Sequence, residues 1–175
     1  MTGMKKLAGR PLPFALRPFA GWWTLPLRLI VGFGFMQHGY AKLARGPDSF
    51  AGILHALGMP MADFLSWATI LVELLGGFAV LAGLFVSLAS IPMAIVLLVA
   101  IVTVHIPNGF SSIKLLSVTA AGAHFGQPGY ETDLLYLAAL AALVLGGSGA
   151  FALDRFIGQG LFGGRAGNND ESRRE

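Results

Sequence analysis

The sequence predicts an all-α integral membrane protein: a bundle of four transmembrane helices with a short interfacial helix between spans 1 and 2. Hydrophobic residues make up 55% of the 175-residue chain and charged residues only 12%, whereas an ordinary soluble domain has about 25% charged residues. The apolar residues gather in long segments, and the 24 glycines are typical of helices that pack closely inside a membrane. This composition excludes a disordered chain and favours a membrane bundle.

Four apolar segments are long enough to cross a bilayer, which takes about 20 residues in a helix. The spans are expected at residues 25–43, 64–84, 86–106 and 132–149. The third segment is apolar on all sides, as a helix surrounded by lipid or by other helices must be. The chain therefore has the segments that a four-span bundle needs.

Two connections between the spans carry further information. Residues 48–57 place four apolar side chains along one side of a helix: Phe50, Ile53, Leu54 and Leu57. This pattern predicts a short amphipathic helix that lies in the membrane interface. Residues 107–130 form a long connection on the same side of the membrane, and loops of this length are often functional.

The distribution of lysine and arginine predicts the orientation. Five positive residues lie before the first span or at its start, four follow the fourth span, and three lie on the opposite side. Because cytoplasmic segments carry the excess of positive charge, both termini are expected in the cytoplasm. The expected organisation is a cytoplasmic segment at 1–23, a membrane domain at 24–154 and a disordered cytoplasmic tail at 155–175.

The composition also excludes several kinds of site and partner. The chain has no cysteine, so it cannot by itself build a disulfide, a thiolate nucleophile or an iron–sulfur cluster. Its four histidines lack the spacing of a metal site, so no metal is expected. The net charge of +3 is small and scattered, which argues against a nucleic-acid partner.

Glu73 is the most informative residue, because it lies near the middle of the second span. A charged side chain there costs about 2.5–3.5 kcal/mol or more, so it usually faces the bundle and finds a partner. Gly76 and Gly77 lie on the same helical face, so a neighbouring helix or a ligand can approach closely. A structural carboxyl and a carboxyl that handles protons or contacts a ligand both fit this position.

The first span carries a cation near each end of one face, Arg28 and Lys42, with small residues such as Gly39 between them. We expect Arg28 to extend to the cytoplasmic headgroups. His38 and Lys42 are four residues apart, so both can point into the outer half of the bundle. A histidine that is simply satisfied in the core, and a lysine that extends outward, are the alternatives.

The third and fourth spans add polar residues at their outer ends. His105 closes the third span and Asn108 follows it. If the helices alternate in direction, His105 meets the polar residues of the first span near the same outer surface. Glu131 and Asp133 open the fourth span, where the positive end of the helix dipole is enough to explain them.

These residues form two sets of candidates. The candidates for proton handling or direct ligand contact are Glu73, His38, Lys42 and His105. The weaker candidates for cofactor contact are Gly39, Gly76, Gly77, Asn108 and Glu131.

The order of short motifs resembles the DoxX family of small four-span membrane proteins, from about residue 25 to residue 154. The motifs are HGYAKL at 38–43, LHALGMP at 54–60, VELLGG at 72–77, VHIPNGF at 104–110, GYE at 129–131 and GSGAFALD at 147–154. Each is weak alone, but their order and spacing over four spans make the resemblance specific.

The resemblance implies a redox-associated protein of the bacterial inner membrane. Members of the family include the small subunit of a thiosulfate:quinone oxidoreductase and membrane partners of enzymes that handle oxidative and thiol stress. A quinone is therefore a candidate cofactor, although the sequence leaves the cofactor unknown, and a membrane or peripheral redox enzyme is a candidate partner. Besides the lipid bilayer, a second copy of the chain is a further candidate partner. An oxidoreductase subunit of this kind acts only with its partners.

Three hypotheses stay open at this point. In the first, the polar residues hold a quinone headgroup: lysine or histidine donates to a carbonyl, and the carboxyl exchanges a proton. In the second, the chain is a non-catalytic scaffold or assembly factor for a partner enzyme, and Glu73 only packs helices. In the third, it is a small proton-coupled transporter, although no inverted repeat or broken helix pair is visible.

Overall fold

The computed structural model describes residues 21–147, 149 and 152–153. Most of the expected N-terminal segment and the whole expected tail at 155–175 lie outside the described residues. The described chain is mostly helical, and each of the four expected spans is a helix or contains one. The helix expected between the first two spans is also present, as α2, Pro47–Ala56.

Helix α1 occupies Thr24–Arg45. It ends at Gly46, whose φ of 93° is a backbone conformation that glycine adopts without steric cost. Pro47 then opens α2 at the first helical position, where a missing N–H costs nothing. The Gly-Pro pair therefore turns the chain sharply from α1 into α2.

The second and third helices are each built from several segments. One runs without a break through α3 (Ala62–Leu71), a π-helical turn η3 (Val72–Gly76) and α4 (Gly77–Ala82). The next runs through α5 (Val86–Ala100), a π-helical turn η4 (Ile101–His105) and a 3₁₀ turn η5 (Ile106–Asn108). These two helices, of 21 and 23 residues, are long and apolar enough to cross a membrane.

Compared with these two helices, the first helix is less apolar and the last helix is shorter. Helix α1 carries the polar residues of the first expected span, and α6, Glu131–Gly146, has 16 residues. The last helix ends three residues before the expected boundary, at Gly147 with a φ of 77°. Two of the four helices are therefore both long and apolar enough to cross a membrane.

The prediction of an all-α protein is wrong in the long connection before α6. Strands β1 (Leu115–Thr119) and β2 (Gly122–Phe125) form an antiparallel two-stranded sheet. The two residues between the strands are alanines, not the Asn-Gly or Asp-Gly pair that marks a tight hairpin in a sequence. The turn instead uses the φ of 122° at Gly122, a conformation that glycine permits.

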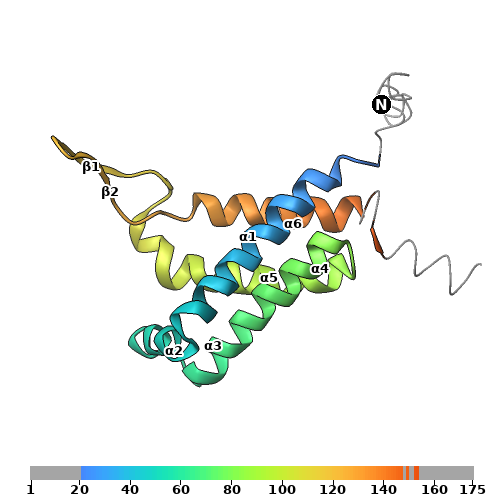
Figure 1. Ribbon diagram of the computed structural model, residues 1–175, viewed down its shortest axis with the longest axis horizontal. Coiled ribbons are helices and arrows are strands. Elements are labelled where there is room, and N and C mark those ends of the chain that lie inside the picture. Colours follow the sequence, from blue (N-terminus) through green and yellow to red (C-terminus); the bar gives the residue numbers. More distant parts are fainter. Residues whose placement is uncertain (1–20, 148, 150–151, 154–175) are drawn as a thin grey trace, which may run out of the picture.

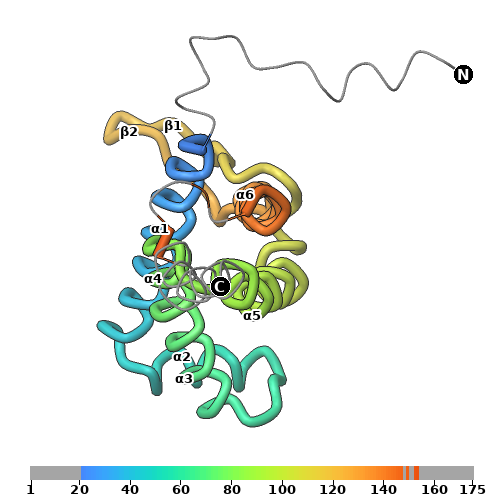
Figure 2. The backbone as a smooth tube through the Cα atoms, turned by 90° about the vertical axis from the view of Figure 1, so that its right-hand side faces the viewer, coloured from blue at the N-terminus to red at the C-terminus, as the bar shows by residue number. Residues whose placement is uncertain are grey.

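The helices run back and forth along the body of the molecule. In Figure 1, α5 and α6 lie nearly parallel, while α1 and the helix that contains α3 and α4 lie side by side and run obliquely to them. The hairpin and α2 lie at one end, and the connection from α4 to α5 lies at the other end (Figures 1 and 2). The ends of the helices that carry the polar candidates are therefore gathered at the hairpin end.

The core lies where α1, α4, α5 and α6 meet. Its buried side chains are Val31, Phe35, Val80, Val86, Met93, Leu97, Leu140 and Leu143. Glycines allow α1 and α4 to approach at backbone distance: a Cβ on Gly32 would lie 2.7 Å from the carbonyl oxygen of Gly77. This close approach fixes α1 against the second helix and so positions Lys42 beside Glu73.

Candidate functional site

The central feature of the site is an ion pair between α1 and the π-helical turn η3. The Nζ of Lys42 lies 2.6 Å from both Oε1 and Oε2 of Glu73. Glu73 is only 4% exposed, and 23% of the Lys42 side chain is exposed. The carboxyl expected to seek a partner has therefore found a cation, which offsets the cost of burying its charge.

Local structure places Glu73 against α1. A π-helical turn inserts an extra residue into the helix and changes where the following side chains point, and such turns are frequent at functional sites. Glu73 lies within the turn Val72–Gly76. Facing it, a Cβ on Gly39 would lie 3.0 Å from the Cβ of Glu73, so glycine is what allows this approach.

Helix α2 covers the exposed side of the pair. The Phe50 ring has its centroid 5.1 Å from Lys42 Nζ, a distance at which the ring face attracts a cation. The buried Ser66 hydroxyl donates to the Pro47 carbonyl at 2.8 Å, which ties the start of α2 to α3. The short helix therefore belongs to the site, because it supplies a third neighbour to the lysine.

His38 lies one helical turn before Lys42 on α1. The His38 side chain is exposed and makes no hydrogen bond within the described part of the chain. We call Glu73, Lys42 and His38 the acid–lysine cluster. It combines one buried carboxylate with two side chains that can donate hydrogen bonds or carry a proton.

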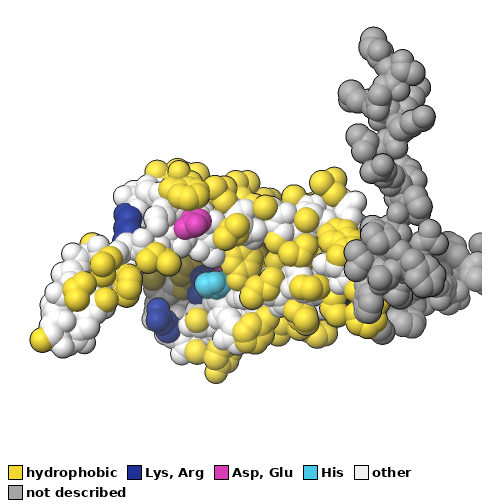
Figure 3. Space-filling view, turned by 90° about the horizontal axis from the view of Figure 1, so that it is seen from above, with side chains coloured by type: hydrophobic (Ala, Val, Ile, Leu, Met, Phe, Trp, Pro, Cys, Tyr) yellow, Lys and Arg dark blue, Asp and Glu magenta, His cyan; other side chains and the backbone are white. Residues whose placement is uncertain are grey.

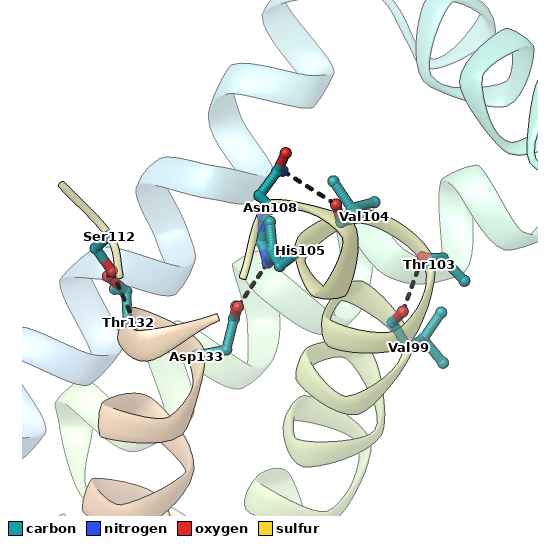
Figure 4. Close-up of polar contacts among 8 residues, drawn as sticks. All are labelled: Val99, Thr103, Val104, His105, Asn108, Ser112, Thr132 and Asp133. Carbon is teal, nitrogen blue, oxygen red and sulfur yellow. Dashed lines mark hydrogen bonds and ion pairs between the residues drawn. The ribbon is translucent and has the colours of Figure 1, made fainter. Parts of the chain in front are cut away.

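His105 belongs to a separate pair at the end of the third helix. Its Nδ1 lies 2.5 Å from Oδ2 of Asp133, and Figure 4 shows the two side chains pointing toward each other from η4 and α6. Asp133 is 7% exposed. The sequence predicts that His105 meets polar residues of the first span. In the structure its hydrogen-bond partner is instead Asp133.

Asp133 is the site residue that sequence reasoning missed as a partner. The helix dipole was sufficient to explain an acidic residue in the first turn of α6, so nothing in the sequence required a histidine partner. His105 ends a π-helical turn, as Glu73 lies within one. Glu73 and His105 thus both lie in π-helical turns, which no residue pattern in the sequence predicted.

Asn108 and Glu131 hold the base of the hairpin. Asn108 Nδ2 donates to the carbonyl of Val104 at 3.2 Å, within its own helix. Glu131 accepts a hydrogen bond from the backbone N–H of Ser112 at 2.9 Å. Each of these two candidates therefore has a local structural partner.

The glycine candidates face neighbouring helices. A Cβ on Gly76 would lie 3.0 Å from the sulfur of Met93, and a Cβ on Gly77 would lie 2.7 Å from the carbonyl oxygen of Gly32. Gly39 faces Glu73 in the same way. The space that these glycines leave is filled by side chains and backbone of the bundle.

Arg28 differs from the expectation that it extends to the headgroups. Its side chain is 2% exposed, and it donates to the carbonyls of Val80 at 3.1 Å and Leu81 at 2.9 Å. The last carbonyls of a helix lack partners within the helix. Arg28 therefore caps the end of α4, and the guanidinium fork suits two adjacent carbonyls better than a single headgroup contact.

Charged and histidine side chains are concentrated toward one end of the molecular surface (Figure 3). On the face seen in Figure 3, the lysine or arginine, acidic and histidine side chains gather toward the hairpin, and apolar side chains cover most of the remainder. Among the described residues, no group of three or more metal-ligating side chains is present.

Comparison with known proteins gives one family and several relatives. The family model DoxX matches residues 23–106. An uncharacterized membrane protein of Mycobacterium tuberculosis is 31% identical over 133 residues, covering 74% of this chain and 77% of the relative. "Putative oxidoreductase CatD" of Bacillus subtilis is 31% identical over 137 residues, covering 78% of this chain and 88% of that protein. An uncharacterized protein of Haemophilus influenzae is 29% identical, covering 73% and 85%. No solved structure matches the chain.

Proposed function

The chain belongs to the DoxX family of membrane proteins, and from this premise we propose that it is a redox-associated membrane subunit that binds a quinone headgroup at the acid–lysine cluster. The buried Glu73 paired with Lys42 at 2.6 Å is the observation that carries the proposal. The name of the Bacillus subtilis relative, an oxidoreductase, supports the redox association.

The proposal includes a topology in which all four helices cross a bacterial inner membrane with both termini in the cytoplasm. The 22 residues of α1 extend about 33 Å, which is enough to cross the apolar core. The 16 residues of α6 extend about 24 Å, and local thinning of the bilayer accommodates a shorter helix. The charge distribution, nine positive residues against three, supports the orientation.

The residues of the cluster fit a quinone headgroup. A lysine has three N–H donors, so the two contacts with Glu73 leave one N–H for a carbonyl oxygen. The exposed His38 ring makes no hydrogen bond within the described residues, so both of its nitrogens are available. The Phe50 ring lies beside the Lys42 donor, and cofactor sites commonly place aromatic side chains next to a few polar groups.

A bound quinone supplies the redox chemistry, since its conversion to a quinol takes up two electrons and two protons. The electrons come from a reductant that a partner enzyme carries. The role of this chain is to orient the headgroup through Lys42 and His38 and to hold or release a proton at the Glu73 carboxyl.

A second candidate, a non-catalytic scaffold for a partner enzyme, is favoured by a different observation. Both polar pairs tie helices together: Lys42 joins α1 to η3, and His105 joins η4 to α6 through Asp133. In this function the pairs fix the bundle and bind nothing. The two candidates therefore differ in whether the cluster has a ligand.

Purification of the full chain from membranes, followed by mass spectrometry of co-extracted lipids, tests the proposal. We expect about one quinone per chain in the wild type, loss of the quinone in Lys42→Met, and retention in the control Lys114→Met. Lys114 directly precedes β1, and within the described residues no hydrogen bond or ion pair joins its side chain to the cluster. A wild-type protein that carries no quinone, or a Lys42→Met protein that keeps it, contradicts the proposal, and a co-purifying enzyme without quinone favours the scaffold.

A further inference from the structure

The hairpin has one apolar face and one polar face. Its register pairs Leu115 with Phe125 and Val118 with Ala123. Partners directly opposite each other share a face, and positions two apart along a strand share it too. Ala123 and Phe125 are two apart, so all four apolar side chains lie on the same face.

The other face is polar by the same reasoning. Ser117 pairs with His124, and Thr119 pairs with Gly122. The Oγ1 of Thr119 lies 3.3 Å from Nε2 of His124, which shows that these two side chains share a face. The extra residue, Leu116, lies where the register is irregular between Leu115 and Ser117.

The apolar face is uncovered within the described structure. Val118 is 71% exposed, Phe125 is 61% exposed and Leu115 is 57% exposed. A two-stranded hairpin with no covered face is only marginally stable in water. This face is therefore available to a partner other than the residues that the structure describes.

The base of the hairpin is fixed at the ends of two helices. Gly129 N–H donates to the Ser111 carbonyl at 2.9 Å, and Glu131 N–H donates to the Phe110 carbonyl at 2.9 Å. The rings of Phe110 and Tyr130 pack edge to face with centroids 5.6 Å apart. The hairpin thus begins where η5 ends and α6 starts, at the level where these helices leave the bilayer in the proposed topology.

The apolar surface continues from the hairpin onto these helices. Exposed apolar side chains lie on η4 and η5 and on the first turn of α6: Val102, Val104, Ile106, Leu134 and Leu135. Between residues 109 and 130, Lys114 is the one residue with a permanent charge. A surface so poor in charge offers little to an electrostatically steered protein partner.

We propose that the hairpin lies on the membrane surface with its apolar face in the outer leaflet and its polar face in water. One apolar face, one polar face and attachment at helix ends are the features of an element that binds the bilayer interface. At this depth water remains available to the unpaired N–H and C=O groups of the strand edges, which hydrocarbon does not provide. The inference rests on α6 and the third helix crossing the bilayer, and it holds with or without a quinone.

Site-directed spin labelling tests this placement directly, because the chain has no native cysteine. Single-cysteine variants Val118→Cys and Phe125→Cys report the apolar face, and Ser117→Cys and His124→Cys report the polar face. The full chain is placed in nanodiscs of phosphatidylethanolamine and phosphatidylglycerol. Collision rates of each label are then measured with oxygen, which concentrates in lipid, and with a water-soluble nickel chelate.

We expect the labels on the apolar face to collide several-fold less often with the nickel chelate, and more often with oxygen, than the labels on the polar face. Val118 and Ser117 are neighbours in the chain and both are exposed, so neither label disturbs packing and the pair is a matched control. Equal nickel accessibility on the two faces overturns the proposal. Shielding of the apolar face from both reagents also overturns it, since it indicates a second copy of the chain.

Discussion

Two cations lie on the same face of α1, and the structure satisfies them in opposite ways. Arg28 is fully buried and donates to the backbone carbonyls of Val80 and Leu81. Lys42 is partly open and contacts the side-chain carboxylate of Glu73. Backbone carbonyls cannot gain or lose a proton, whereas a carboxylate can. Among the contacts described, those of Arg28 therefore stabilise a helix end, whereas those of Lys42 include a group that can exchange a proton.

The helix segments that face the two cations also differ. Opposite Arg28, α4 ends at Gly83 with a φ of 70°, a common helix ending in which the N–H groups of Gly83 and Leu84 bond to the carbonyls of Val80 and Ala79. Arg28 adds a donor to the next carbonyl, that of Leu81. Opposite Lys42, the helix continues through a π-helical turn. The first arrangement is explained by the need to satisfy a helix end. The second has no such explanation, because the turn lies in the middle of a helix.

The substitution with the largest expected effect is Glu73→Gln, at the Lys42 end. Glutamine keeps the shape and can accept from Lys42, but it has no acidic proton to exchange. If the carboxyl handles protons beside a quinone, quinone reduction in native membranes falls by a factor of about 10²–10⁴ while the protein still folds. The thermal unfolding midpoint serves as the control. If quinone turnover is unchanged and the thermal unfolding midpoint is normal, Glu73 does not handle protons. The scaffold function is then the better supported candidate.

The next largest effect is expected for Lys42→Met, which removes the cation and leaves Glu73 buried. Breaking a buried pair on one side costs about 3 kcal/mol, because the remaining group loses its compensation. The double variant Lys42→Met/Glu73→Gln removes both charges and is expected to recover most of the loss. Chemical unfolding of both proteins in detergent measures the difference. A double variant as unstable as the single one would show that packing, not charge pairing, sets the cost.

A change at the Arg28 end tests the structural half of the comparison. Gly83→Ala places a side chain where φ is positive, which costs about 1–2 kcal/mol. The new Cβ would also lie 2.6 Å from Cζ of Arg28, so the cap is displaced and the total loss is about 3 kcal/mol or less. The control is Gly52→Ala on α2, where a Cβ meets nothing within 4 Å.

We expect Gly52→Ala to stabilise the protein slightly, by about 0.5–1 kcal/mol, because alanine loses less backbone entropy in a helix. Quinone content is expected to be normal in both glycine variants. A Gly83→Ala protein that is as stable as the wild type would show that Arg28 does not depend on this helix end. Thermal unfolding of the wild type and the two variants measures these differences in stability.

The sequence predicted the helices well because their signal is local. The buried side chains of α1 include Arg28, Phe35 and Gly39, which lie on the face that helical spacing indicates. Each of the four apolar segments forms a helix close to the expected bounds. The hairpin was missed because its turn has two alanines and a single glycine, and because its strands are short and exposed.

The site was only partly predictable, because pairing depends on which helices become neighbours. A charge in the middle of a span requires some partner, and Lys42 was one of the residues expected near it. The partner of His105 was not predictable, since the helix dipole already explained Asp133. The role of Arg28 was misjudged for a related reason: a helix end that needs a cap is visible only when the two helices are placed together.

The smallest expected effect concerns this second pair, and a matched pair elsewhere on the chain makes it measurable. Asp133→Asn keeps an oxygen that can accept from His105 Nδ1 but removes the charge, so the loss is about 1 kcal/mol. The control is Asp63→Asn, because Asp63 faces His55 at 3.9 Å with both side chains exposed, and exposed pairs contribute about 0–1 kcal/mol.

A carboxylate partner holds the His105 proton on Nδ1, so ¹⁵N chemical shifts of the labelled ring are expected to change in Asp133→Asn and not in Asp63→Asn. If the ring shifts stay the same while stability falls, Asp133 only joins two helices. If both change, the aspartate also sets which nitrogen of His105 is free, and the described residues at the Lys42 end of the molecule then include two side-chain pairs capable of moving protons.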